Sequence, residues 1–148
     1  MITEKVTGDT AKLLKECDAG AKTAIKSLDE VLDTIKNSQL KNLIMDSKNA
    51  HRQVEAEIEL LLIKNRQDGK EPSPMAKAMS WTKINFKIMS ENSDKAIADL
   101  MTDGCDMGVK TLTKYKNEYK KADKEAVNIA DKLIALEKEL EDQLKKYL

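Results

Sequence analysis

The side chains most suited to chemistry are one histidine and a few carboxylates at helical spacing. His51 is the single histidine among the 148 residues, and Glu55 follows it by one helical turn. Glu137 holds the matching place in the C-terminal half. Imidazole and carboxylate groups bind iron, zinc and manganese, so His51, Glu55 and Glu137 form a candidate metal site, joined by Asp18 or Asp106. The competing interpretation, which we favour, is a hydrogen-bonded polar pair at the edge of a helical bundle. Asp18 and Asp106 are each followed four residues later by a lysine, which favours simple ion pairs within a helix.

Two cysteines, Cys17 and Cys105, could supply redox chemistry if they approached one another. Neither has a histidine beside it or the Cys-x-x-Cys spacing that lowers a thiol pKa, so small buried thiols are the preferred interpretation. The sequence also has no glycine-rich phosphate loop and no Gly-x-Ser-x-Gly elbow. We therefore predict no catalytic residue and no bound cofactor, and the pattern does not indicate an enzyme.

The elements that must position these side chains are long helices. Charged residues make up 35% of the chain and aromatic residues only 3%, which is typical of helical proteins. Apolar residues at intervals of three and four predict helices over 9–35, 38–66, 94–121 and from 123 to the C-terminus. Ser38 is the expected N-cap of the second helix, and Gly69 is the expected left-handed residue after it. A shorter helix over 75–89 is expected after Ser73-Pro74.

A repeated phrase relates the first two helices to the last two. Residues 17–23 are CDAGAKT and residues 105–111 are CDMGVKT, an offset of 88. Further along the chain the offset is 86, and the matched pairs are Asn42 with Asn128, Val54 with Leu140 and Ile58 with Leu144. An internal repeat of 9–66 and 94–148, joined by a crossover over 67–93, predicts two helical hairpins related by a near two-fold rotation. They would pack as a four-helix bundle in a single domain, 1–148, with Gly20 and Gly108 at helix–helix contacts.

This arrangement resembles the ferritin-like superfamily. Residues 75–115 carry the more specific similarity, through the stretches MAKAMSW and SDKAIADLMTDGCDMGVKTLTKY, and are similar to an uncharacterised bacterial family of ferritin-like proteins. Di-metal sites of the superfamily take a Glu from each of two helices and a Glu-x-x-His from each of the other two. Here Lys48 stands three residues before His51, and Ile134 three residues before Glu137. The resemblance therefore implies a bundle whose di-metal ligands are largely missing.

The net charge and the length of the apolar runs limit the classes of partner that the sequence predicts. The formal net charge is zero, and the basic run over 110–124 contains Glu118 and Asp123. We therefore expect no nucleic-acid partner and interpret the run as a solvated helix end. The longest apolar run, 60–63, is far shorter than the roughly 20 residues of a membrane span, so no membrane partner is expected. Without a secretion signal, and with two cysteines, the expected location is cytoplasmic.

A possible homodimer is the last expectation, and it rests on the crossover helix. Trp81, Ile84 and Ile88 gather on one side of this helix, nearly opposite a second stripe that includes Met75 and Phe86. Either the helix is wedged between the bundle and its own chain, or Trp81, Ile84 and Ile88 form a contact between two copies. Taken together, these features favour a non-enzymatic structural or interaction protein of unknown role. The alternative is a metal-binding or metal-dependent protein.

Overall fold

The chain is helical throughout most of its described length. A computed structural model describes residues 8–72 and 93–148. The helices within them are α1 (Gly8–Leu32), α2 (Ser38–Lys64), α4 (Ser93–Glu118) and α5 (Lys124–Leu144), followed by the short 3-10 helix η1 (Lys145–Tyr147). These residues contain no strand, so the all-α prediction is confirmed. The predicted helix over 75–89, with the contact at Trp81, Ile84 and Ile88, lies outside the described residues.

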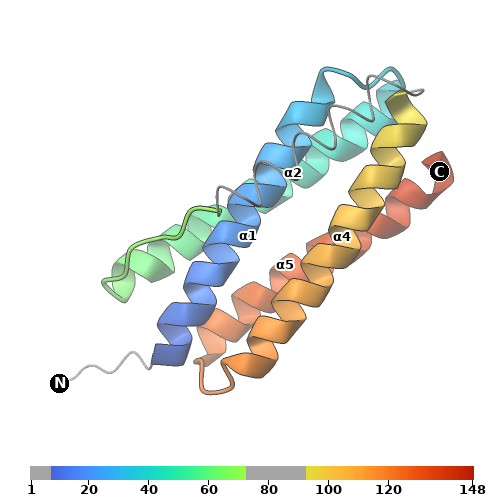
Figure 1. Cartoon of the computed structure of the whole chain (residues 1–148). Helices are drawn as coiled ribbons and strands as arrows, with labels where there is room; N and C mark the ends of the chain where they lie inside the picture. Colours follow the sequence, from blue (N-terminus) through green and yellow to red (C-terminus); the bar gives the residue numbers. More distant parts are fainter. Residues whose placement is uncertain (1–7, 73–92) are drawn as a thin grey trace.

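Two antiparallel helix pairs make up the bundle (Figure 1). One pair is α1 with α2, and the other is α4 with α5. The pairs share one interior because α5 also lies against both α1 and α2, and α1 lies against α4. After α2 the chain turns, and residues 67–72 run back beside α1. This return brings the loop backbone onto a polar side chain of α1.

Side-chain caps determine where α2 and α5 begin. The side-chain oxygen of Asn37 accepts hydrogen bonds from two amides of the first turn, at 2.9 and 3.0 Å. Asn37 is therefore the N-cap of α2, and the prediction of Ser38 is wrong by one residue. Asp123 caps α5 by accepting from the amide three residues on, at 2.9 Å. The prediction for Gly69 is also wrong, because the residue with positive φ after α2 is Arg66, at 56°.

Two apolar clusters fill the bundle, one towards each end. The first cluster contains Leu13, Leu14, Cys17, Ala21, Val54, Ile58, Leu62, Leu112, Ala126, Ile129, Ala130 and Leu133. The second cluster contains Leu28, Val31, Leu32, Ile35, Leu40, Ile44, Ile97, Met101, Cys105, Leu140 and Leu144. Each cluster draws on α1, α2, α4 and α5, so the burial of apolar surface holds the two helix pairs together at both ends.

The two repeated glycines differ in their surroundings. A Cβ on Gly108 would lie 2.8 Å from Oε1 of Glu137, so Gly108 allows a close approach between α4 and α5. Gly20 is exposed, and a Cβ there would only touch Leu112 of α4, at 4.0 Å. The prediction that both glycines lie at helix–helix contacts is therefore confirmed for Gly108, whose contact is with α5. Gly20 lies at the exposed rim of the contact between α1 and α4, so its contact is a loose one.

Alanine substitutions separate these two roles. Gly20→Ala should raise the free energy of unfolding by about 0.5–1 kcal/mol, because Ala is preferred to Gly inside a helix and the added methyl meets no close atom. Gly108→Ala should gain less, because its methyl displaces the Glu137 carboxylate. Urea denaturation measures both changes. Gly104→Ala is the control, since a Cβ there has nothing within 4 Å. Equal gains at all three positions would contradict the close approach at Gly108.

Candidate functional site

A polar layer lies between the two apolar clusters. His51 on α2 falls between Ile44 of the second cluster and Val54 of the first, and Glu137 on α5 likewise falls between leucines of the two clusters. The side chain of His51 is 1% exposed and that of Glu137 is 14% exposed. Nε2 of His51 lies 3.6 Å from Oε2 of Glu137. His51 therefore belongs to a polar pair, as expected, but its partner is Glu137, the two side chains are too far apart for a hydrogen bond, and the pair lies inside the bundle rather than at its edge.

A hydrogen bond on the other side of the ring fixes the imidazole. Nδ1 of His51 lies 2.7 Å from the carbonyl oxygen of Ser47, so Nδ1 carries a proton and donates it. Nε2 then faces Glu137 at a distance longer than a hydrogen bond but short enough for charge attraction. Burial opposes the charged imidazolium, but the Glu137 carboxylate and the Ser47 carbonyl outweigh it, and the pKa of His51 is raised. The pair therefore carries opposite charges to a higher pH than an exposed histidine would allow.

Glu137 is also approached from α4. Burial raises the pKa of the Cys105 thiol above its ordinary value, and the charge of Glu137 and a hydrogen bond with it raise the pKa further. The thiol thus stays protonated. Gly108, three residues further along α4, leaves the room that the carboxylate occupies. Side chains and backbone from two helices, α2 and α4, therefore hold Glu137 in place.

A second polar group is buried around Asp18 of α1. The side chain of Asp18 is 1% exposed, and its Oδ2 accepts hydrogen bonds from Nζ of Lys22 and from the backbone N–H of Lys70, both at 2.8 Å. The predicted ion pair of Asp18 with Lys22 is confirmed. Lys22 also reaches Glu71, at 2.7 Å. A Cβ on Gly69 would lie 2.4 Å from Oδ2 of Asp18, so the loop after α2 closes directly over this carboxylate.

Glu55 of α2 is the partner of the other Asp18 oxygen. Glu55 is 8% exposed, and among residues 8–72 and 93–148 neither of its oxygens, nor Oδ1 of Asp18, has a hydrogen-bond partner. Burial, followed by a hydrogen bond with Asp18 and the charge of Asp18, raises the pKa of Glu55 to about 9. Near neutral pH Glu55 is therefore protonated. One proton shared by the two carboxyl groups would give these buried oxygens a partner.

A similar carboxyl pair occurs in the second helix pair. The pKa of Glu141 on α5 is raised, first by a hydrogen bond with Asp106 of α4 and then by burial and the charge of Asp106. The partner found for Asp106 is thus Glu141 rather than the predicted lysine. Asp18 and Asp106 are 88 residues apart, and Glu55 and Glu141 are 86 apart. These are the offsets of the sequence repeat. The second pair is the more exposed of the two.

The cysteines belong to different parts of the core. Cys17 lies in the first apolar cluster and Cys105 in the second, and both are free and buried. Burial, with the charges of Glu16 and Asp18, raises the pKa of Cys17 to about 12. A thiol that stays protonated is a poor nucleophile and a poor partner for disulfide exchange. The prediction of small buried thiols is confirmed.

The three residues of the candidate metal site do not converge. His51 meets Glu137, whereas Glu55 turns to Asp18. Within the described ranges, 8–72 and 93–148, no group of three or more His, Cys, Asp or Glu side chains is arranged to hold a metal ion. Sequence reasoning missed Cys105 as a neighbour of Glu137, and Asp18 as the partner of Glu55. Both contacts cross between helices, and spacing along one helix shows only neighbours on the same face.

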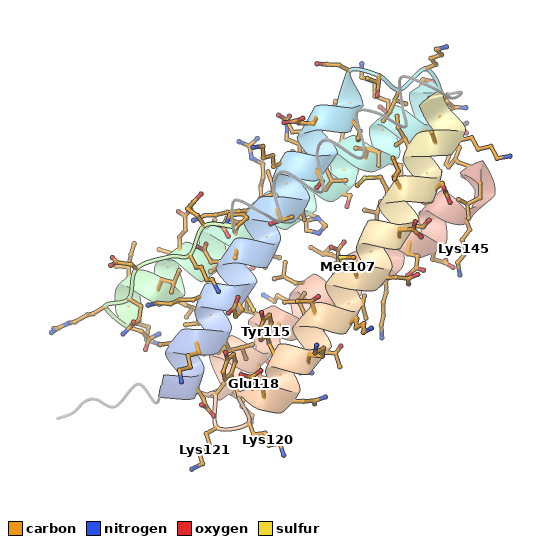
Figure 2. The ribbon with its side chains drawn as sticks, viewed as in Figure 1. Met107, Tyr115, Glu118, Lys120, Lys121 and Lys145 are labelled. Atoms are coloured by element: carbon orange, nitrogen blue, oxygen red, sulfur yellow. The ribbon has the colours of Figure 1, made fainter. Side chains whose placement is uncertain are left out.

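The outward faces of the helices are strongly polar. Figure 2 shows Lys120 and Lys121 in the turn between α4 and α5, with side chains directed away from the bundle. Lys116 pairs with Asp131 of α5. These positions agree with the interpretation of the basic run as a solvated helix end. None of the described helices is long and apolar enough to cross a membrane.

The shared proton predicts how stability depends on pH. The pKa of Glu55 is higher in the folded chain than its ordinary 4.5, so its contribution to stability is complete below about pH 4.5 and is lost as pH rises towards about 9. Glu55→Gln keeps a donor towards Asp18 at every pH. This variant should therefore be more stable than the wild type at about pH 8, by at least about 1 kcal/mol in urea denaturation.

The matched control for this prediction is Glu141→Gln, which changes the more exposed carboxyl pair and should shift the stability less. The free energy of unfolding is measured for the wild type and for Glu55→Gln from pH 4 to 9. The difference between the two values at each pH isolates the titration of Glu55 from that of other groups. Parallel pH profiles for these two proteins would show that Glu55 is ionised in the folded chain and that no proton is shared with Asp18.

Comparison with solved structures finds a likeness over nearly the whole chain. A DUF305 fragment from Deinococcus radiodurans matches with a TM-score of 0.77 over 97% of each chain, at 14% sequence identity. At this identity the likeness shows the fold alone. No family model matches the chain, and no curated protein matches it. The chain is thus similar in fold to a helical domain of unknown function, and its place in the ferritin-like superfamily stays a prediction.

Proposed function

We propose that the chain is a ferritin-like bundle in which internal polar pairs occupy the positions of metal ligands. It would work as a non-enzymatic structural or interaction protein in a bacterial cytoplasm. The observation that carries this proposal is the contact of His51 with Glu137. The one histidine in the sequence faces a carboxylate as its counter-charge, and both lie in the polar layer of the core.

The proposal includes the internal duplication inferred from the sequence. His51 and Glu137 are 86 residues apart, the same offset that relates Glu55 to Glu141. Two hairpins related by a near two-fold rotation would bring equivalent positions close to the axis into contact with each other. The contact between His51 and Glu137, together with the two carboxyl pairs, supports such a relation. An ancestral pair of equivalent residues would then have diverged into a histidine and a glutamate.

The surroundings of the buried carboxyl groups also support a structural role. A carboxyl group with a strongly raised pKa is often part of an active site, so a catalytic role for Glu55 has to be weighed against a structural one. Asp18 and Glu55 are 1% and 8% exposed, and the backbone of the loop closes over Asp18 at Gly69 and Lys70. A substrate could not reach the shared proton unless this loop moved away. We therefore infer that the pair holds the loop after α2 against α1.

The second candidate is a metal-binding or metal-dependent protein, with iron, zinc or manganese at His51 and Glu137. One observation favours it. Nδ1–H of His51 donates to a backbone carbonyl while Nε2 faces a carboxylate, and metal-binding histidines are commonly oriented by such a bond from the other ring nitrogen. Glu55, the third residue of the predicted site, would need to leave Asp18 to take part.

Metal analysis of protein purified without a histidine tag separates the two candidates. We expect less than stoichiometric iron, zinc or manganese in the wild type. His51→Ala should lower the free energy of unfolding by about 1–3 kcal/mol, because Glu137 loses its partner in a largely buried position. Addition of iron, zinc or manganese should leave the urea midpoints of the wild type and of His51→Ala unchanged. Stoichiometric metal in the wild type that disappears in His51→Ala would contradict the proposal and support a metal site.

A further inference from the structure

One stripe of side chains on α4 faces away from the bundle and repeats every seven residues. It has a centre line, a charged flank and a flank of small residues. The centre line is Leu100, Met107 and Lys114, the charged flank is Asp103 and Lys110, and the small flank is Gly104 and Thr111. Leu100 is half-buried and the others are exposed, including Met107 (labelled in Figure 2), whose side chain is 69% exposed. A repeat of seven residues is the spacing of a helix that packs along another helix.

The charged flank carries opposite charges on the two sides of Met107. Asp103 comes four residues before Met107, and Lys110 comes three residues after it. Within the described ranges, 8–72 and 93–148, neither side chain forms an ion pair or a hydrogen bond. The helix dipole does not explain their order, because both lie more than two turns from the ends of α4 and the effect of the dipole is confined to the terminal turns. An exposed apolar residue is thus flanked by two unpaired and opposite charges.

The small flank leaves room beside Met107. Gly104 lies well inside α4, where glycine is less favourable than alanine. A Cβ on Gly104 would have nothing within 4 Å, so no contact in the described part of the chain requires a glycine there. Thr111, one repeat later, is also a short side chain. A second helix could therefore approach the backbone of α4 closely along this flank.

We propose that this stripe of α4 is a contact between two copies of the chain, packed antiparallel about a two-fold axis at Met107. In this arrangement each flank meets the same flank of the partner in the reverse direction. Asp103 then lies opposite the partner's Lys110, and Gly104 lies opposite the partner's Thr111. The two Met107 side chains pack against each other across the axis. The inference rests on the proposed role as an interaction protein and names its partner.

The order of the charges selects a second copy as the occupant. A two-fold contact requires a surface that is complementary to itself, and opposite charges placed on both sides of an apolar centre meet this requirement. A parallel pairing would put Asp103 against the partner's Asp103. The apolar centre is small, and exposed ion pairs each contribute little. We therefore expect a weak dimer that exchanges with monomer and that salt weakens further.

Sedimentation velocity over a series of concentrations tests the proposal on the full chain. The wild type should shift from monomer to dimer as its concentration rises. Met107→Gln should raise the dissociation constant of the dimer by about tenfold or more. It should leave the helical circular dichroism unchanged, since the side chain is exposed. The matched control is Met45→Gln on α2, where the methionine is 41% exposed, and it should dimerise as the wild type does.

Two charge changes add a test that a loss of stability cannot imitate. Asp103→Lys puts a lysine opposite the partner's Lys110, and Lys110→Asp puts an aspartate opposite the partner's Asp103. Each variant alone should therefore dimerise more weakly than the wild type, by about tenfold or more. A mixture of the two variants should form a heterodimer, because each lysine at these positions then faces an aspartate. The matched control is Asp46→Lys, the same change at an exposed position of α2, which should leave dimerisation unchanged.

Two results would overturn the proposal directly. One is a wild type that stays monomeric at the highest concentration, and the other is a pair of charge variants that fail to dimerise when mixed. A dimer lost in Trp81→Ala with Ile88→Asp but kept in Met107→Gln would also overturn it, and would assign the contact to the crossover. None of these results depends on metal content, so the proposed function keeps its own test.

Discussion

The contact of His51 with Glu137 is the interaction on which the arrangement of the helices depends. Apolar clusters at the two ends of a bundle favour burial but accept many side-chain matches, and one helix can slide by a turn at modest cost. A buried imidazolium is stable only when α2 and α5 are in the register that brings a carboxylate next to it. A slide of one turn, about 5.4 Å, would place each charge against leucines and leave it without a partner. The polar layer therefore selects one register, as single polar residues do in coiled coils.

The neighbours of this pair fit the same explanation. Gly108 removes the side chain that would otherwise meet the carboxylate, and the Cys105 thiol stays protonated and so adds no second negative charge. The Asp18–Glu55 pair uses a different device, a shared proton in place of a counter-charge, and connects α1 to α2. It also orders the loop after α2, because Lys70 donates its backbone N–H to the same carboxylate. Each buried polar group thereby ties together two elements of the fold that apolar packing alone would leave free to shift.

The helices could be predicted from the sequence because they depend on local patterns. Apolar spacing and composition located α1, α2, α4 and α5 to within a few residues at their ends, and the ion pair of Asp18 with Lys22 followed from spacing within one helix. The misplaced cap at Ser38, where Asn37 is used, reflects two neighbouring residues with equal capping ability. The partners of His51 and Glu55 could not be predicted in the same way. They lie on other helices, and the rotation of each helix within the bundle decides which side chains meet. The equal offsets in the repeat carried part of this information, since they placed His51 and Glu137 at equivalent positions.

The measurement that tests this explanation most directly is an NMR titration of the imidazole of His51. The sequence has one histidine, so the ring signals need no assignment by comparison. We predict a pKa above its ordinary 6.5 in the wild type, because Glu137 and the Ser47 carbonyl favour the charged ring, and a lower pKa in Glu137→Gln. A pKa at or below 6.5 that Glu137→Gln leaves unchanged would contradict the ion pair. A ring that does not titrate because a metal occupies Nε2 would contradict it equally.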